Sequence, residues 1–209
     1  MEEPSVYQEA KTLSTAPKGP VSRKPRADAQ RNREELASAA KAAFAELGSD
    51  VSLEEIARRA GVGIGTLYRH FPTRNAVIEH VYRREVEQLA AASTHLLETL
   101  PPGQALHEWM RLFVDYVATK KVIASALTAI ANDAPELAAT SAMQITDAMF
   151  LLVERAKAAG DIRPDADPND LLRALVGFTF GNTSPNWQPS ALRLIAILMD
   201  GLRAATIAR

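Results

Sequence analysis

Hydrophobic residues recur at helical spacing through almost the whole chain after Asp28. In the first run they fall at i, i+3, i+4, i+7, i+8 and i+11, which makes one apolar stripe on an α-helix. Its members are Leu36, Ala39, Ala40, Ala43, Phe44 and Leu47. Gly48 follows directly, as glycine does at the C-terminal end of many helices. We find no run of alternating apolar and polar residues rich in β-branched side chains, so the pattern predicts helices and no sheet.

Two short helices are predicted next. Ser52 and Glu55 have the spacing of a capping box, which marks the start of a second helix that stops at Gly61. A third helix runs from about 64 to 71 and ends before Pro72, because proline cannot continue it.

The rest of the chain is helical in pattern, with Pro, Gly, Asn and Asp between the segments. We expect about six further helices, near 75–99, 104–120, 122–131, 136–159, 168–182 and 190–206. The predicted fold is all-α, with an N-terminal three-helix domain and a C-terminal helical domain. The predicted boundaries are 1–27 for an N-terminal arm, 28–89 for the first domain and 90–209 for the second.

The arm is poor in large apolar side chains and holds four prolines, so we expect residues 1–27 to be disordered. Its end is basic, because the segment from Lys18 to Arg33 carries six basic residues and one acidic residue, Asp28. Such a segment is either a solvated tail or an arm that lies along DNA phosphates. The sequence leaves both readings open.

Composition narrows the class of protein. The chain is 47% hydrophobic and 23% charged with a formal net charge of −1, so it is no polycation, and nucleic-acid binding depends on where its charges lie. It has no cysteine, which excludes disulfides, thiolate metal sites and cysteine nucleophiles. No stretch approaches the roughly 20 apolar residues of a membrane span. The first residues lack the apolar segment of a signal peptide, so we expect a cytoplasmic protein.

No catalytic or metal site is predicted. His80, His95 and His107 share no ligand spacing, and no serine–histidine–acid arrangement can be argued. The acidic residues just before position 170 resemble the opening of a calcium loop but lack its glycine. We interpret Asp167 instead as a helix N-cap followed by Pro168. We therefore expect no cofactor and no enzymatic activity.

The second and third helices meet in a tight turn, Ala60-Gly61-Val62, where glycine allows a positive φ. A turn this short makes the two helices cross steeply, as in a helix-turn-helix. In a helical projection, the side of the third helix that faces the second holds Ile64, Leu67 and Phe71. The outward side holds Thr66, Arg69 and His70, with Tyr68 at the boundary. A polar side of this kind fits the major groove of DNA.

These residues resemble the DNA-binding domain of the TetR family of transcriptional regulators. The family pattern is an Ala-Gly-Val turn and then Gly-Thr-Leu-Tyr-x-His/Tyr-Phe, and this chain has Ala60-Gly61-Val62 and then Gly65-Thr66-Leu67-Tyr68-Arg69-His70-Phe71. The resemblance covers about 29–89, and beyond it only the helical pattern and the length agree. It implies double-stranded operator DNA as the partner. The predicted DNA-binding residues are Ser52, Gly63, Ile64, Thr66, Tyr68, Arg69, His70 and Arg74, of which Thr66, Tyr68 and His70 match contact positions of the family.

The match to the family has two points of difference. Arg74 stands where the family usually has a phosphate-binding lysine. Gly63 stands where many members have a polar side chain, so it makes no side-chain contact with a base. Ile64 beside it either meets a thymine methyl group or packs in the core, and the sequence leaves both open.

The last two predicted helices have more apolar surface than one core requires. In 190–203, the polar residues lie along one face, and the preceding helix carries small residues that permit close helix contact. We hypothesise that these two helices pair with their copies in a four-helix homodimer interface, which the resemblance also implies. The predicted interface residues are Ala174, Gly177, Gly181, Leu194, Ile195, Leu198 and Leu202.

The resemblance further implies a small-molecule effector that binds in the C-terminal domain. The predicted pocket residues are Trp109, Met110, Phe113, Tyr116, Met143, Phe150 and Phe178, for each of which ordinary core packing is the alternative. An apolar effector would change the spacing of the recognition helices and release the operator. We expect a repressor, although an activator would share these features. The alternative is a helical small-molecule-binding protein or enzyme with a vestigial DNA-binding domain. Such a protein would have lost residues such as Gly61, Tyr68 or His70, and all three are present.

Overall fold

The computed structural model describes residues 25–133 and 135–203, and within them the secondary structure is helical apart from one isolated bridge between Ile162 and Arg203. The predicted all-α fold is confirmed. The helices of the described part are α1 Pro25–Leu47, α2 Leu53–Arg59, α3 Ile64–His70, α4 Arg74–Thr99, α5 Pro102–Val122, α6 Ala124–Asp133, α7 Pro135–Ala158, α8 Pro168–Phe180 and α9 Trp187–Leu202.

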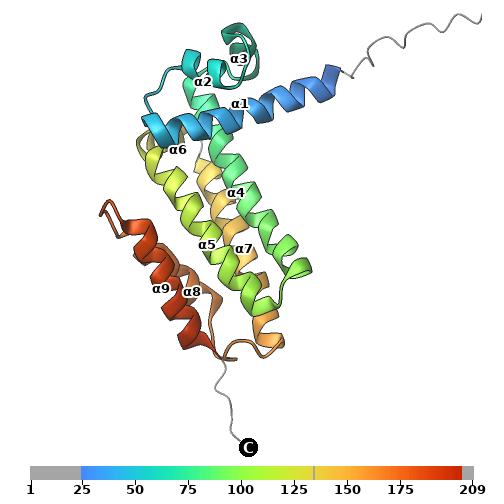
Figure 1. The fold of residues 1–209 in the computed structure, drawn as a ribbon, viewed down its shortest axis with the longest axis vertical. Coiled ribbons are helices and arrows are strands. Elements are labelled where there is room, and N and C mark those ends of the chain that lie inside the picture. Colours follow the sequence, from blue (N-terminus) through green and yellow to red (C-terminus); the bar gives the residue numbers. More distant parts are fainter. Residues whose placement is uncertain (1–24, 134, 204–209) are drawn as a thin grey trace, which may run out of the picture.

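The helices form a long bundle with a small head at one end (Figure 1). Helices α4, α5 and α7 pack against one another along the long axis, and α1 crosses their upper end. The short helices α2 and α3 lie at that same end. Helices α8 and α9 pack together along the side of the bundle, against α5. The head therefore holds the helix-turn-helix, and the bundle holds the C-terminal helices.

The turn between α2 and α3 has the predicted geometry. Gly61 has φ of +69°, and the N–H of Val62 donates to the carbonyl of Ala57 over 3.0 Å. Leu67 and Phe71 of α3 are almost completely buried, at 0% and 2% exposure. Because the turn is short and these two side chains are enclosed, α3 has one orientation on the head.

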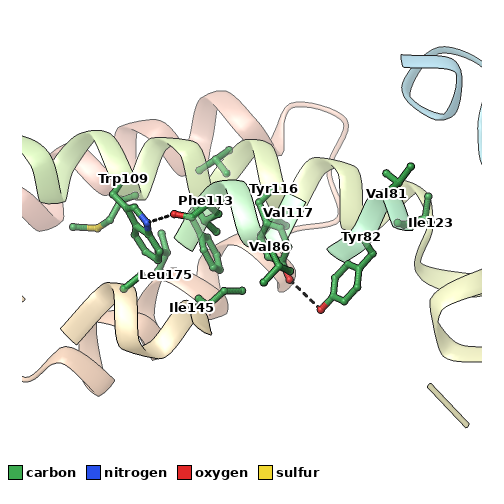
Figure 2. Packing of buried hydrophobic residues seen from close by; sticks show 14 of the residues in the cluster. Val81, Tyr82, Val86, Trp109, Phe113, Tyr116, Val117, Ile123, Ile145 and Leu175 are labelled. Carbon is green, nitrogen blue, oxygen red and sulfur yellow. Dashed lines mark hydrogen bonds between the residues drawn. The ribbon is translucent and has the colours of Figure 1, made fainter. Parts of the chain in front are cut away.

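Helix α4 belongs to both parts of the molecule. Its first turns bury Val77 in the head, and its later turns are bonded to α5. The indole Nε1 of Trp109 donates to the carbonyl of Leu89 over 2.8 Å, and the hydroxyls of Tyr82 and Tyr116 lie 3.4 Å apart (Figure 2). Any displacement of α5 is therefore passed to the helix that carries the head.

The N-terminal helix is longer than predicted. It begins at Pro25, inside the predicted arm of 1–27, because proline is well tolerated in the first turn and the alanines that follow favour a helix. Residues 1–24, which make up the rest of that arm, lie outside the described residues.

The start of α8 confirms that Asp167 is a helix N-cap, and the C-terminal end of α9 corrects its predicted length. The Asp167 carboxylate accepts the N–H groups of Asn169 and Asp170, as an N-cap does. Helix α9 was predicted over 190–206 but ends at Leu202, whose carbonyl accepts the N–H of Arg163 over 2.8 Å. That bond to the loop before α8 takes the acceptor that a further helical turn would need.

Within 25–133 and 135–203, no helix is long and apolar enough to cross a membrane. The same residues contain no group of three or more potential metal ligands.

Candidate nucleic-acid interface

Ser52 holds the start of α2, the first helix of the helix-turn-helix. Its hydroxyl accepts the N–H of Glu55 over 3.1 Å. The reciprocal half of the capping box is replaced, because the Glu55 carboxylate bonds Arg58 and Arg59 at 2.7–2.8 Å instead. These guanidinium groups lower the pKa of Glu55 to about 2. Ser52 is exposed and keeps its own O–H as a donor that can face outward.

Phe71 anchors the C-terminal end of α3. Its ring lies 5.1 Å from the ring of His80 on α4 and beneath the Arg33 guanidinium of α1, 5.2 Å from the ring centroid. Burial and the charges of Arg33 and Arg84 lower the pKa of His80, so the imidazole is neutral at pH 7. Sequence reasoning assigned Arg33 only to the basic segment, because a contact between α1 and α3 has no local signal.

The outward side of α3 holds the side chains that the projection placed there. Tyr68 is 47% exposed and Arg69 is exposed, while Thr66 and His70 are half-buried. Gly63 and Gly65 are exposed with open space where a Cβ would lie. Ile64 is partly buried and packs against the core cluster, as one of its two interpretations proposed. The remainder of its side chain is exposed, so contact with a thymine methyl group stays open.

Arg74 is engaged with the protein itself. Its guanidinium donates to the carbonyls of Ser49 at 2.6 Å and Val51 at 2.5 Å, with Asp50 at 3.5 Å. These carbonyls lie in the loop between α1 and α2, where no helical partner is available. Arg74, which was predicted to bind a phosphate, thus hydrogen-bonds the loop before α2 to the start of α4.

Two segments of the chain match known families. Residues 36–81 match the bacterial regulatory proteins of the tetR family, and residues 101–204 match the C-terminal domain described as transcriptional regulator SbtR-like. A TetR transcriptional regulator from Streptomyces coelicolor, known from a crystal structure, shares 42% sequence identity with this chain. The two structures superpose with a TM-score of 0.76, covering 83% of this chain and 99% of that one. The chain belongs to the TetR family. It is a DNA-binding transcriptional regulator with a helix-turn-helix, and the family is not one of enzymes.

Other relatives agree with this membership. The TetR regulatory protein from Mycobacterium vanbaalenii is 34% identical with a TM-score of 0.72, over 85% of this chain and 98% of that one. An HTH-type transcriptional regulator of Staphylococcus aureus (strain USA300) is 31% identical over 103 residues. That match covers 49% of this chain and 54% of the relative, so the chain spans about half the length of the curated relatives it matches.

The predicted effector-pocket residues divide between the core and the surface of this TetR-family regulator. Trp109, Met110, Phe113 and Tyr116 are enclosed in the bundle core. The Phe113 ring lies between those of Trp109 and Tyr116, with ring centroids 6.0 and 5.5 Å away (Figure 2). Met143 and Phe150 are 59% and 40% exposed on α7, and Phe178 is partly buried. Large side chains fill space rather than leave it, so choosing the aromatic residues selected the core.

A cavity of about 350 Å³ lies instead among α4, α5, α6, α7 and α8. Its lining is Tyr82, Lys120, Lys121, Ala124, Leu127, Thr128, Leu137, Ala138 and Phe180. Alanines on facing helices leave room there, and that pairing of small residues is visible only once the helices are placed.

The predicted interface residues divide into two groups. Ala174, Gly177, Gly181 and Leu194 are exposed and Leu198 is partly buried. Ile195 and Leu202 are a correction, because both are buried within their own subunit and have no surface to offer a partner. Ile197, two residues from Ile195, is 66% exposed and was absent from the predicted set.

The contacts of Arg74 predict a stability effect. Arg74→Ala leaves the loop carbonyls without a donor and lowers the free energy of unfolding by about 1–3 kcal/mol. Arg69→Ala, on the exposed side of α3, changes it by less than about 0.5 kcal/mol. Urea denaturation of both variants measures the difference. Equal stability of the two variants would show that the Arg74 bonds are dispensable to the fold.

Proposed function

We propose that this regulator represses transcription by binding a pseudo-palindromic operator as a homodimer, and that a small apolar molecule releases it. The exposed Tyr68 on a rigidly held α3 is the observation that carries the proposal. An aromatic side chain that is 47% exposed beside the buried Leu67 has no role in the subunit's own core. Its hydroxyl and ring suit contact with a phosphate and a sugar or base edge.

The contacts on DNA follow from the exposed side of the head. Thr66 and His70 lie on the side of α3 away from Leu67 and supply short donors and acceptors for base edges. Tyr68 flanks them at the boundary, and the exposed part of Ile64 can meet a thymine methyl. Arg69 and the hydroxyl of Ser52 reach phosphates. Gly63 and Gly65 add no side chain there, so the backbone at the start of α3 can lie close to the duplex.

The dimer uses the side of α8 and α9 that faces away from α5. Val176, Leu194 and Ile197 are 39%, 37% and 66% exposed on these two helices. Gly177 and Gly181 are exposed and carry no side chain, so a partner helix can approach the backbone there. A two-fold pairing through this face carries two heads to one duplex, with half-sites one helical turn apart.

The effector acts through α4. Tyr82 lines the cavity and lies on the same helix as His80, whose ring packs against Phe71 at the end of α3. A molecule that displaces Tyr82 tilts α4 and so changes the spacing of the two heads. A regulator that reads a chromosomal operator in this way works in the cytoplasm.

The DNA-binding proposal predicts the loss of a defined motif. We expect the purified protein to enrich a pseudo-palindrome from a pool of DNA fragments. The double variant Tyr68→Ala, His70→Ala binds that motif at least about tenfold more weakly, because each good base contact contributes about 1–3 kcal/mol. Met143→Ala, at a 59% exposed position on α7, serves as the control. Enrichment of the same motif by the double variant would contradict the assignment of α3.

The dimer proposal predicts that one exposed isoleucine controls assembly. Ile197→Arg buries a charge in the proposed interface and converts the dimer to a monomer. Met143→Arg, at a similarly exposed apolar position outside α8 and α9, leaves the dimer intact. Sedimentation at micromolar concentration distinguishes the two. A monomeric wild type, or dissociation by Met143→Arg alone, would place the interface elsewhere or remove it.

A further inference from the structure

Lys120 carries an ammonium group into the cavity among α4–α8. Its Nζ lies 5.6, 5.8 and 5.3 Å from the ring centroids of Tyr82, Tyr116 and Phe180. Among the residues whose side chains the structure describes, no carboxylate lies within ion-pair distance of it and no acceptor takes a hydrogen bond from it. Lys120 is therefore a partly buried cation surrounded by rings.

The neighbouring lysine shows the contrast. Lys121 also borders the cavity, but its Nζ donates to the carbonyl of Asn182 over 2.7 Å and lies 4.0 Å above the ring of Trp187. Its ammonium is thus satisfied within the protein. Aromatic faces attract the Lys120 cation but accept no strong hydrogen bond, so its three N–H donors are available to a ligand.

We propose that the cavity takes an anionic amphiphile, a carboxylate on an apolar body, with Lys120 as its counter-ion. This rests on the proposed function, in which a small molecule controls the regulator, and names the chemical class of that molecule. A carboxylate at Lys120 gains charge-assisted hydrogen bonds beside three aromatic rings, where less water competes for the cation than on the open surface.

Tyr82 and Tyr116 support the assignment of the anion site to the end of the cavity near Lys120. Burial and the neighbouring Tyr82 hydroxyl raise the pKa of Tyr116, so its O–H stays protonated. Within that pair, 3.4 Å is a long hydrogen bond, and an anion beside Lys120 offers the Tyr82 hydroxyl a stronger acceptor.

The rest of the lining fits the apolar body. Ala124, Leu127, Leu137 and Ala138 add only hydrocarbon surface from α6 and α7. The volume of about 350 Å³ is at the lower end for small-molecule sites, which favours a single chain or ring over a large polycycle. Charge at one end and hydrocarbon at the other define an amphiphile.

The test compares three probes of equal length: decanoate, 1-decanol and decylammonium. Isothermal titration of the full chain is expected to show that decanoate binds most tightly. Lys120→Met keeps the apolar stem and weakens decanoate binding by about tenfold or more, without weakening that of 1-decanol. Lys120→Arg keeps the preference for the anion. Lys157→Met, which removes a lysine paired with Glu154 at the end of α7, leaves all three affinities unchanged.

Several results would overturn the inference. They are equal affinities of decanoate and 1-decanol for the wild type, equally tight binding of decanoate by Lys120→Met, and no binding of decanoate at millimolar concentration. A melting temperature of Lys120→Met close to that of the wild type excludes unfolding as the cause of a loss.

A second readout separates this inference from the proposed function. The anisotropy of the enriched operator fragment is followed as each probe is added. If decanoate binds in a Lys120-dependent way but does not release DNA, the anion site is supported and the effector role is contradicted. Release of DNA by 1-decanol and not by decanoate keeps the effector role and overturns the anion site.

Discussion

Helix α4 is buried along both halves of its length, and this constraint links the two parts of the molecule. Near its middle, the carboxylate of Glu85 is only 8% exposed and bonds Lys41 of α1 and, at 3.4 Å, the hydroxyl of Thr119 of α5. A buried carboxylate that loses its cation is costly, so α1, α4 and α5 stay joined at this point. Tyr82, one turn before Glu85, lines the cavity. Because Tyr82 and the residues packed in the head lie on one helix, a tilt of α4 would move both the head and the lining of the cavity.

The head itself is built to be rigid. Gly61 sets the turn, and Arg74 ties the loop before α2 to the first turn of α4. Rigid contacts of this kind concentrate any motion at α4 and the bundle. In the proposed dimer, operator affinity would then depend on the distance between two heads more than on the shape of either one. In the proposed mechanism, repression and release differ by a displacement of whole heads.

Local signals in the sequence were enough to predict the helix-turn-helix. The Ser52 cap, the Gly61 turn and the spacing of Leu67 and Phe71 each depend on residues a few positions apart, and the structure has all three. The half of the capping box that did not form, at Glu55, was lost to arginines on the same helix.

The C-terminal sites depend on how distant helices meet, and there the sequence was less informative. Ile195 and Ile197 are the same residue type, but positions i and i+2 of a helix point about 200° apart. Ile195 is therefore buried and Ile197 exposed. The cavity exists because Ala124 of α6 and Ala138 of α7 come together with Lys120, a juxtaposition with no signal in the chain. Trp109, in contrast, is conspicuous in the sequence and lies at the centre of the core.

The distance between the two heads of a dimer is the quantity on which this account depends most directly. The chain has no cysteine, so Ala42→Cys, at an exposed position of α1, takes one spin label per subunit. Pulsed dipolar spectroscopy then reports the distance between the labels. The account predicts a broad distribution in the free protein that narrows to a single distance when the enriched operator is bound. Absence of dipolar coupling, or the same distribution with and without operator, would contradict it.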